Sequence, residues 1–313
     1  MSFAADTKNE LAHIETEKKC CMLAEIAGFI RMCGSVKLGG AGKISVVTST
    51  ENPAIARRYK KLIKDYFNID SKLEVGQCEG PRKGRTYHLT IPPEQRSEQL
   101  LRETGILMVR EGLNYISDGI YDGLIKTKCC RKAYLRGAFL GAGTIIDPMK
   151  GYHLEFVCTT EVLAVDLKKL INSFVDLSAK TVRRKNSFVV YVKESGQITD
   201  ILNIMGAHSH LLVFENVKIE KEMRNRANRI YNCDSANVDK TVNAAARQIE
   251  SIRKVESTKG LGSLPEKLYN IALLRLEHPE SSLSELAELA DPPLKKPGIN
   301  NRLKKIEEIA AKL

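Results

Sequence analysis

The chain has 313 residues, of which 43% are hydrophobic and 28% charged, which is enough apolar material for a buried core and predicts two or three domains. Lys and Arg number 49 against 38 for Asp and Glu, so the net charge of +11 favours a polyanionic partner, nucleic acid first and an anionic membrane second. No stretch approaches the roughly 20 apolar residues of a membrane span, which excludes an integral membrane protein. The mixed-charge start, MSFAADTKNELAHIE, has no apolar core, so we expect a cytoplasmic protein.

Eight cysteines are expected to be reduced thiols rather than disulfides: Cys20, Cys21, Cys33, Cys78, Cys129, Cys130, Cys158 and Cys233. No CxxC occurs, and no His lies at zinc-finger spacing from a Cys pair. The vicinal pairs Cys20-Cys21 and Cys129-Cys130 suggest either a metal or redox site or small buried residues at a helix start. We favour the second interpretation and therefore expect no metal and no cofactor.

An internal repeat occupies the first two thirds of the chain. KCCMLAEIAGFIRMCGSV (19–36) aligns with KCCRKAYLRGAFLGAGTI (128–145), and the similarity continues downstream. Each copy, about 17–107 and 126–216, is predicted to run helix, two strands, helix, two strands, helix. A single copy would expose one sheet face, so we expect the two copies to pair about a pseudo-twofold axis and bury their apolar helices.

The first helix of each copy carries small residues three and four apart: Ala24, Ala27 and Gly28 in the first copy, and Ala133, Gly137 and Gly141 in the second. A glycine within a helix costs about 1 kcal/mol relative to alanine, so its repeated use needs a reason. Small side chains let two helix backbones approach closely. The pattern therefore predicts a close seam between the two first helices.

This double motif resembles the LAGLIDADG homing endonuclease fold, a saddle of two αββαββα halves with paired motif helices. The resemblance implies that the last acidic residue of each motif helix would bind the catalytic divalent metal. Here Cys33 and Ala142 stand at those positions, and Arg31 and Leu140 at the other usual acidic ones. Because Mg²⁺ requires hard oxygen ligands, we expect a retained fold, a lost nuclease site and no catalytic residue.

Beyond residue 216 the pattern becomes helical, and we interpret 217–260 as a helical linker region. We predict two helices, 219–232 and 232–257, the second capped by Asp234 or Ser235, with a flexible break at KGLGS (259–263). The expected apolar stripe consists of Val238, Val242, Ala245, Ile249 and Ile252. Basic residues on these helices mostly indicate a solvated face, but four are candidates for phosphate contacts: Arg224, Arg226, Arg229 and Arg247.

The last segment, 261–313, resembles a helix-turn-helix domain. Pro265 starts the first helix, and Ser282 with Glu285 makes a capping box for the second. DPPLKKPG stops the second helix, because two prolines cannot continue it. A final helix, GINNRLKKIEEIAAKL, is predicted to pack through Ile299, Leu303, Ile306 and Ala310.

Charge is segregated within this segment. Residues 277–291 contain five acids and no Lys or Arg, whereas residues 292–305 contain five bases and no acid. A recognition helix presents its N-terminal residues to base edges in the major groove, with Lys and Arg on phosphates. We therefore expect double-stranded DNA to be contacted by Ser282, Lys295, Lys296, Gly298, Asn300, Asn301, Arg302, Lys304 and Lys305.

Almost the whole chain resembles the WhiA family, through stretches that include EIAGFIRMCGSV, EMRNRANRIYNCDSANVDKTVNAAARQIESI and SLSELAELADPPLKKPGINNRLKKIEEIA. The resemblance implies a degenerate LAGLIDADG domain, here 1–216, joined to a C-terminal helix-turn-helix. It also implies a role as a sporulation transcription regulator or as a cell-division and chromosome-segregation protein. Pro297 departs from the pattern, since a capping Ser or Thr is expected before Gly298.

We therefore predict an α+β duplicated LAGLIDADG-like domain followed by an all-α domain, in a non-catalytic DNA-binding protein of the bacterial cytoplasm, associated with the nucleoid. We expect it to act in cell division and chromosome segregation and to regulate transcription. The alternatives are a protein-interaction adaptor, whose LAGLIDADG-like domain binds a partner protein, and an active homing endonuclease. An RNA-binding module is disfavoured, because no RNP aromatic motif or GXXG clamp is present. The residues predict no membrane partner and leave the oligomeric state open.

Overall fold

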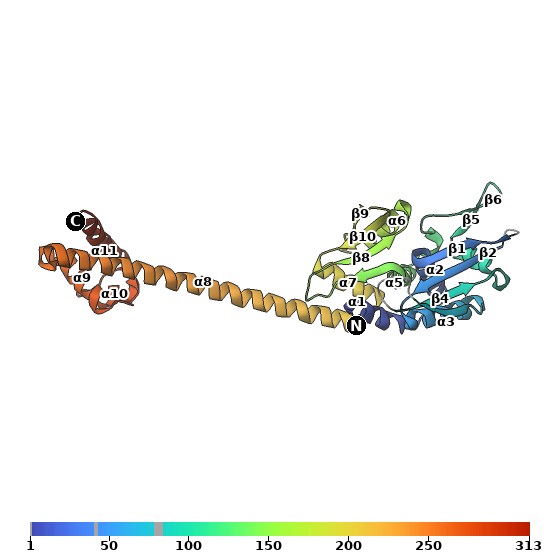
Figure 1. Ribbon diagram of the computed structural model, residues 1–313, viewed down its shortest axis with the longest axis horizontal. Coiled ribbons are helices and arrows are strands. Elements are labelled where there is room, and N and C mark those ends of the chain that lie inside the picture. The colour runs from blue at the N-terminus through green and yellow to red at the C-terminus, as the bar shows by residue number, and fades with distance from the viewer. Residues whose placement is uncertain (1, 41–42, 78–83) are drawn as a thin grey trace. The chain divides into compact units, whose positions relative to one another are not determined.

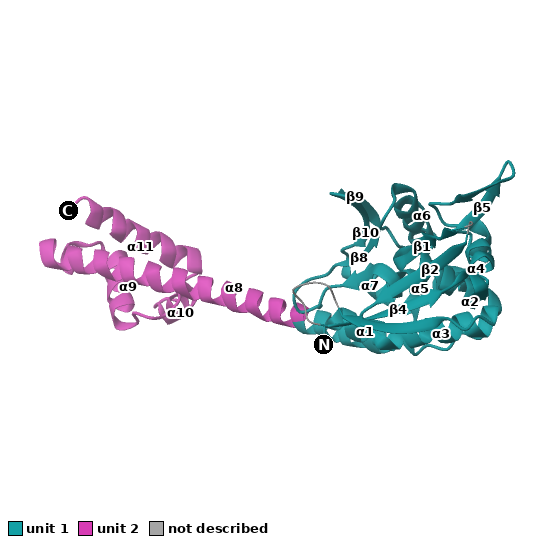
Figure 2. Cartoon of the chain, turned by 45° about the vertical axis from the view of Figure 1, so that its right-hand side comes forward, with its two compact units in different colours: residues 1–220 teal, residues 221–313 magenta. Residues whose placement is uncertain are grey.

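The computed structural model describes residues 2–40, 43–77 and 84–313, so Cys78 lies outside the described residues. The chain divides into two compact units, residues 1–220 and 221–313 (Figure 1, Figure 2). Unit 1 combines sheets and helices, and unit 2 is helical apart from its connecting turns. The α+β class, with a duplicated αββαββα domain before an all-α domain, is confirmed.

Unit 1 contains two copies of one element order, preceded by α1 (Phe3–Ala12) and joined by the hairpin of β5 (Leu107–Arg110) and β6 (Leu113–Ile116). The first copy comprises α2 (Lys19–Cys33), β1 (Gly34–Leu38), β2 (Ile44–Thr50), α3 (Pro53–Phe67), β3 (Lys72–Gln77), β4 (Arg85–Ile91) and α4 (Ser97–Glu103). The second comprises α5 (Lys128–Ala142), β7 (Gly143–Ile145), β8 (Leu154–Cys158), α6 (Glu161–Asn172), β9 (Lys180–Arg184), β10 (Ser187–Val192) and α7 (Ser195–Met205). The predicted helix–strand order is confirmed in both copies.

Each copy forms an antiparallel four-stranded sheet with the same topology. The strand order is β1-β2-β4-β3 in the first sheet and β7-β8-β10-β9 in the second. The apolar faces of the two sheets and their helices share one continuous hydrophobic core, which includes Phe29 from the first copy and Phe139 from the second. Because this core spans both copies, neither copy buries its apolar surface without the other.

Helices α2 and α5 pack along each other at the centre of unit 1. A Cβ added at Gly28 would lie 2.4 Å from the Tyr134 carbonyl oxygen, and one added at Gly137 would lie 2.1 Å from the Glu25 carbonyl oxygen. Real Cβ atoms essentially never approach other atoms so closely, so both positions require glycine. The close seam predicted from the spacing of small residues is confirmed.

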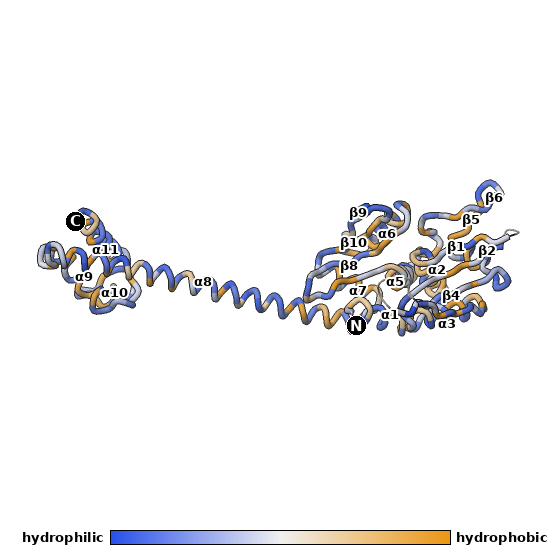
Figure 3. The backbone as a smooth tube through the Cα atoms, in the orientation of Figure 1, coloured by the Kyte–Doolittle hydropathy of each residue, from blue (hydrophilic) through white to orange (hydrophobic). Residues whose placement is uncertain are grey.

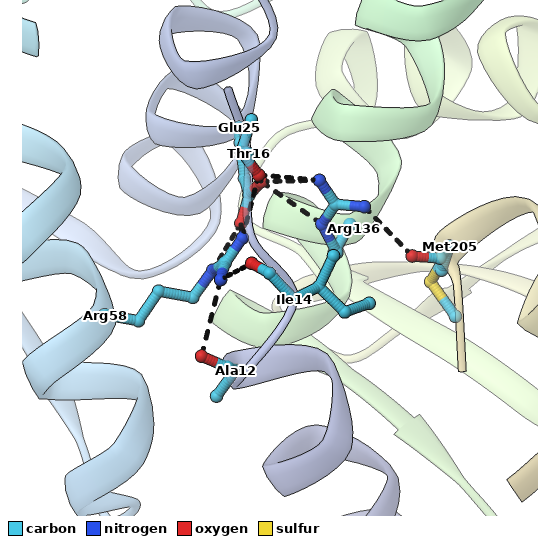
Figure 4. A network of polar contacts seen from close by, with 7 residues as sticks. All are labelled: Ala12, Ile14, Thr16, Glu25, Arg58, Arg136 and Met205. Atoms are coloured by element: carbon cyan, nitrogen blue, oxygen red, sulfur yellow. Dashed lines mark hydrogen bonds and ion pairs between the residues drawn. The ribbon is translucent and has the colours of Figure 1, made fainter. Parts of the chain in front are cut away.

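A buried carboxylate crosses this seam (Figure 4). Glu25 on α2 is fully buried; its Oε1 accepts from Arg58 Nε at 2.6 Å, and its Oε2 accepts from Arg136 Nη2 at 2.8 Å. Arg58 lies on α3 of the first copy and Arg136 on α5 of the second. Further guanidinium N–H groups donate to the backbone carbonyls of Ala12, Ile14 and Met205. The network therefore ties the two copies together through one acid and two bases.

Two of the four vicinal cysteines do not fit the packing interpretation. Cys21 and Cys130 are buried, as expected for small residues at a helix start, but Cys20 is exposed and Cys129 only half-buried. Both pairs occupy the first turns of α2 and α5. Packing therefore explains Cys21 and Cys130. The expectation that Cys20 and Cys129 would also be buried is wrong.

The helices predicted at 219–232 and 232–257 are one continuous helix, α8 (His208–Lys259). Asp234 is exposed and Ser235 half-buried; both lie within this helix and cap nothing, because the chain around them stays helical. The predicted apolar stripe is also wrong at one end: Val238 and Val242 are exposed, whereas Ala245 and Ile252 are buried. Hydrophilic residues predominate along α8 (Figure 3). The predicted break does occur, at Gly260, which has a φ of +79°.

Unit 2 packs three helices against the end of α8: α9 (Glu266–Glu277), α10 (Leu283–Leu289) and α11 (Lys296–Ala311). Their common core includes Leu268 and Ile271 from α9 and Leu286 from α10. The final helix contributes the predicted stripe of Ile299, Leu303, Ile306 and Ala310. The trihelical arrangement expected from the sequence is therefore present.

The ends of α10 and α11 follow from local chemistry. Ser282 accepts from the Glu285 backbone N–H at 3.3 Å, and the Glu285 carboxylate accepts from the Ser282 N–H at 2.7 Å, which confirms the capping box. Helix α11 begins at Lys296, two residues before the predicted start, with Pro297 in its first turn. Proline is tolerated there because the first N–H groups of a helix have no intrahelical partner.

Candidate nucleic-acid interface

One face of α11 is buried and the opposite face is exposed and basic. Ile299, Leu303 and Ile306 point into the unit 2 core. Asn301, Lys304 and Lys305 are exposed and follow the helical spacing of a single face on the other side. No hydrogen bond or ion pair within the described part of the chain engages these two lysine side chains, so their charges face solvent.

The predicted contact residues around this face differ in exposure. Lys295, the residue preceding α11, and Lys296, its first residue, are both exposed. Gly298, Asn300 and Arg302 are half-buried and flank the face rather than lie on it. Asn300 and Arg302 lie on the two sides of the face formed by Asn301, Lys304 and Lys305, because successive residues of an α-helix are rotated around its axis. Glu308 adds an exposed acid one turn beyond Lys304.

Ser282 is half-buried, and its hydroxyl accepts the hydrogen bond of the capping box at the start of α10.

Another residue that fixes this region is Arg275 on α9, which is 1% exposed. Its Nη1 donates to the Ser281 carbonyl at 2.6 Å and to the His278 carbonyl at 3.3 Å, and so holds the turn between α9 and α10. Burial lowers the pKa of Arg275 from its ordinary value. The only signal for Arg275 in the sequence is a base within the apolar run LLRL.

The four arginine candidates on α8 are exposed: Arg224, Arg226, Arg229 and Arg247. Their side chains make no ion pair with any residue that the structure describes. The structure thus leaves all four guanidinium groups accessible.

The C-terminal ends of α2 and α5 carry the residues that replace the acidic metal ligands of the LAGLIDADG motif. Cys33 and Ala142 end the two helices, and a Cβ added at Gly141 would lie 3.6 Å from Cys33 Sγ, so the two ends are adjacent. The Cys33 thiol donates to the Phe29 carbonyl at 3.3 Å, and burial raises its pKa to about 12. A protonated thiol and a methyl group offer no ligand to a hard divalent cation, so these residues do not fit the metal.

A cationic side chain approaches the same place. Lys8 on α1 lines a cavity of about 740 Å³ together with Leu140 and Gly141, and its Nζ lies 5.8 Å from the Phe139 ring centroid. Burial lowers the pKa of Lys8 to about 8, while Cys33 and Glu51 act in the opposite direction. A positive charge here further disfavours a divalent cation.

Arg31 stands at another usually acidic position of the LAGLIDADG motif, and its guanidinium group binds backbone carbonyls. It donates to the Gly105 carbonyl at 2.9 Å and to the Ser117 carbonyl, and so secures the segment around the β5–β6 hairpin. Burial lowers the pKa of Arg31 from its ordinary value. The side chain serves the backbone of its own unit and offers nothing to a metal.

Three family models together match most of the chain. They are the WhiA N-terminal LAGLIDADG-like domain at residues 19–107, the WhiA LAGLIDADG-like domain at 131–224 and the WhiA C-terminal HTH domain at 227–310. The chain belongs to the WhiA family.

WhiA proteins of known name and structure match over their full length. A "Probable cell division protein WhiA" from Alkaliphilus oremlandii is 49% identical, with 100% of this chain and 98% of the relative covered. One from Thermoanaerobacter pseudethanolicus is 48% identical with the same coverage. The crystal structure of full-length DUF199/WhiA from Thermotoga maritima matches with 26% identity and a TM-score of 0.62, covering 100% of this chain and 99% of that one.

Sequence reasoning about this WhiA chain missed several residues that the structure singles out. Lys8 lies outside both repeats, and Glu25 stands out only as an acid in an apolar helix. Arg58 and Arg136 gave no signal, because their pairing with Glu25 joins residues 33 and 111 positions apart.

Among the described residues, no helix is long and apolar enough to span a membrane.

Proposed function

We propose that this chain is a non-catalytic protein that binds double-stranded DNA and acts in bacterial cell division. We extend the proposal to chromosome segregation and transcription regulation, carried out in the cytoplasm at the nucleoid. The match to the family's C-terminal HTH model supports the DNA partner. The names of the relatives, which call them probable cell division proteins, support the process.

The observation that carries the proposal is the basic face of α11. Lys304 and Lys305 are exposed on a short, well-packed helical unit, and neither forms an ion pair within the described chain. Lysines held on a rigid helix without acidic partners favour a polyanion, since binding releases the counterions that the polyanion has condensed.

We assign roles to the residues of this face and to those that flank it by residue chemistry. Lys304 and Lys305 would contact phosphates, while Asn301 and Arg302 would reach base edges, as amide and guanidinium groups do for adenine and guanine. The residues at the start of the helix, Lys295, Lys296, Gly298 and Asn300, would add backbone contacts, and Ser282 would lie beside them at the start of α10. The arginines at 224, 226, 229 and 247 are further phosphate candidates on α8.

Substitution of the basic face tests the proposal directly. In the full-length chain, Lys304→Ala and Lys305→Ala should each weaken binding to all duplexes and lower the slope of log affinity against log salt by about 0.9. Lys267→Ala removes an exposed lysine of α9 and serves as the matched control, with no change in slope expected.

Asn301→Ala and Arg302→Ala should instead lose about 1–3 kcal/mol of preference between duplex sequences. If none of the four substitutions changed the affinity for duplex DNA, α11 would be excluded as the DNA-recognition helix.

The absence of nuclease activity is tested separately. The purified protein should leave supercoiled plasmid intact with Mg²⁺ or Mn²⁺, because Cys33 and Ala142 supply no oxygen ligand for the metal that stabilises phosphodiester cleavage. Metal-dependent nicking that co-purifies with the protein through successive columns would contradict the non-catalytic assignment.

A second function, binding of a protein partner by unit 1, is favoured by the β5–β6 hairpin. Val109, Leu113 and Ile116 on this hairpin are 55%, 74% and 49% exposed, an unusual density of apolar surface on two short strands. Leu113→Lys should then impair cell division while DNA affinity stays unchanged. Normal division of cells that carry Leu113→Lys would contradict a role for the hairpin in partner binding.

A further inference from the structure

Four thiols converge where the two copies meet. Cys20 and Cys21 come from the first turn of α2, and Cys129 and Cys130 from the first turn of α5. The four Sγ atoms all lie within 4.8 Å of one another, although the two pairs are more than a hundred residues apart in the sequence. The packing of α2 along α5 brings them together, one pair from each copy.

We propose that these four cysteines bind a single Zn²⁺ ion that joins the two copies of unit 1. A tetrahedral Zn²⁺ site has Zn–S bonds of about 2.3 Å, which separates its sulfurs by about 3.8 Å. The observed separations require the thiols to close by only ~1 Å, which small side-chain rotations supply. Four protein ligands complete the coordination shell, so the ion has a structural role and no open position for substrate.

The residue types and their place at the two helix starts suit a soft or borderline metal. Both cysteine pairs lie in the first turns of helices, where backbone N–H groups without an intrahelical partner and the helix dipole stabilise negative charge. The Thr127 hydroxyl lies 3.2 Å from Cys129 Sγ and caps α5 through the Cys130 N–H, which orients this pair. Sulfur ligands select Zn²⁺ over Mg²⁺ and Ca²⁺, whose preferred ligands are oxygens.

This site is distinct from the positions of the LAGLIDADG metal ligands. Cys20 and Cys33 stand near opposite ends of α2, which has 15 residues. At 1.5 Å per residue the two ends are about 20 Å apart. The proposed Zn²⁺ therefore lies at the other end of the α2–α5 seam from the lost nuclease metals, and it has no part in phosphodiester chemistry.

Metal analysis of the full-length chain tests the assignment. Protein purified under reducing conditions without chelator should contain about one Zn²⁺ per chain, as measured by inductively coupled plasma mass spectrometry. The double variant Cys20→Ser/Cys129→Ser should lose it, and Cys233→Ser, which changes an exposed cysteine of α8, should retain it. Replacement by Co²⁺ should give thiolate-to-cobalt absorption in the wild type and in Cys233→Ser only. Because Cys20 and Cys129 are the more exposed member of each pair, the variant should keep the native fold, which circular dichroism verifies.

Three results would overturn the proposal. One is a wild-type chain that holds no Zn²⁺ after incubation with ZnCl₂ under reducing conditions and subsequent dialysis. Another is equal Zn²⁺ content in the wild type and in the folded double variant. The third is a disulfide among the four cysteines in cells lysed directly into an alkylating agent, since oxidised sulfurs cannot ligate the metal.

Discussion

The two ends of the α2–α5 seam differ in what their residues can bind. At the C-terminal ends, Cys33 and Ala142 stand where the LAGLIDADG pattern places acids, and Lys8 brings a positive charge close by. At the N-terminal ends, four thiols gather within 4.8 Å. The same pseudo-twofold scaffold brings equivalent residues of the two copies together at both ends. Residue chemistry alone then decides that the first end rejects a hard cation and the second suits a soft one.

Between the two ends, the seam is held by close backbone contact and by the buried Glu25 network. If this middle part is what keeps both ends in register, weakening it should destabilise unit 1 as a whole. Changes confined to one end should have smaller effects.

The largest effect is expected for Glu25→Gln. The substitution keeps the shape of the side chain but leaves the buried guanidinium groups of Arg58 and Arg136 without a counter-charge, which should cost about 3–5 kcal/mol of unfolding free energy. Urea unfolding followed by circular dichroism measures it. Glu98→Gln, which breaks an exposed pair with Arg102, is the matched control, with an expected change of about 0.3–0.5 kcal/mol. Equal effects for the two variants would show that the seam does not depend on the network.

A smaller loss is expected for Gly137→Ala. The added methyl would lie 2.1 Å from the Glu25 carbonyl oxygen, so α2 and α5 must separate, at a cost of about 1–3 kcal/mol. Gly196→Ala provides the control, since a Cβ at that helical position meets nothing within 4 Å and should be neutral or stabilising. Thermal unfolding of both variants distinguishes close packing from a general intolerance of substitution in unit 1.

The smallest effect concerns Lys8 and depends on pH. Its pKa of about 8 in the folded state lies below the ordinary value of 10.5, so the folded chain releases this proton more easily than the unfolded chain. The cost of burying the charge is present in full below pH 8 and disappears as the pH rises to about 10.5. Lys8→Met should therefore stabilise the protein by about 1 kcal/mol at neutral pH, a value reduced for the partial exposure of the side chain.

The advantage of Lys8→Met over the wild type should vanish in unfolding measurements near the upper end of that pH range. Lys267→Met, on the exposed surface of α9, should show no advantage at either pH. A stabilisation of Lys8→Met that does not depend on pH would mean that apolar packing, rather than the charge, accounts for the difference.

Features with a short-range cause were predictable from the sequence. The capping box of Ser282 and Glu285 depends on residues three apart, and the buried stripe of α11 depends on helical periodicity. The close seam was predictable because the glycines recur at matched positions in the two copies. Helix α8 was predicted wrongly at Asp234 and Ser235, since residues that favour caps are also tolerated on an exposed helical surface. The DNA-contacting residues stay a prediction, and the structure adds which of them are exposed.

By itself the sequence determined the duplicated domain, its helix–strand order, the trihelical C-terminal unit and the replacement of the acidic motif positions, because each of these follows from local pattern or residue type. Only the tertiary structure decided that Glu25 meets Arg58 and Arg136, that Lys8 approaches Cys33, and that the two cysteine pairs form one cluster. These contacts join distant parts of the chain, and their distances are set by how closely α2 and α5 pack. No pattern within a single segment contains that information.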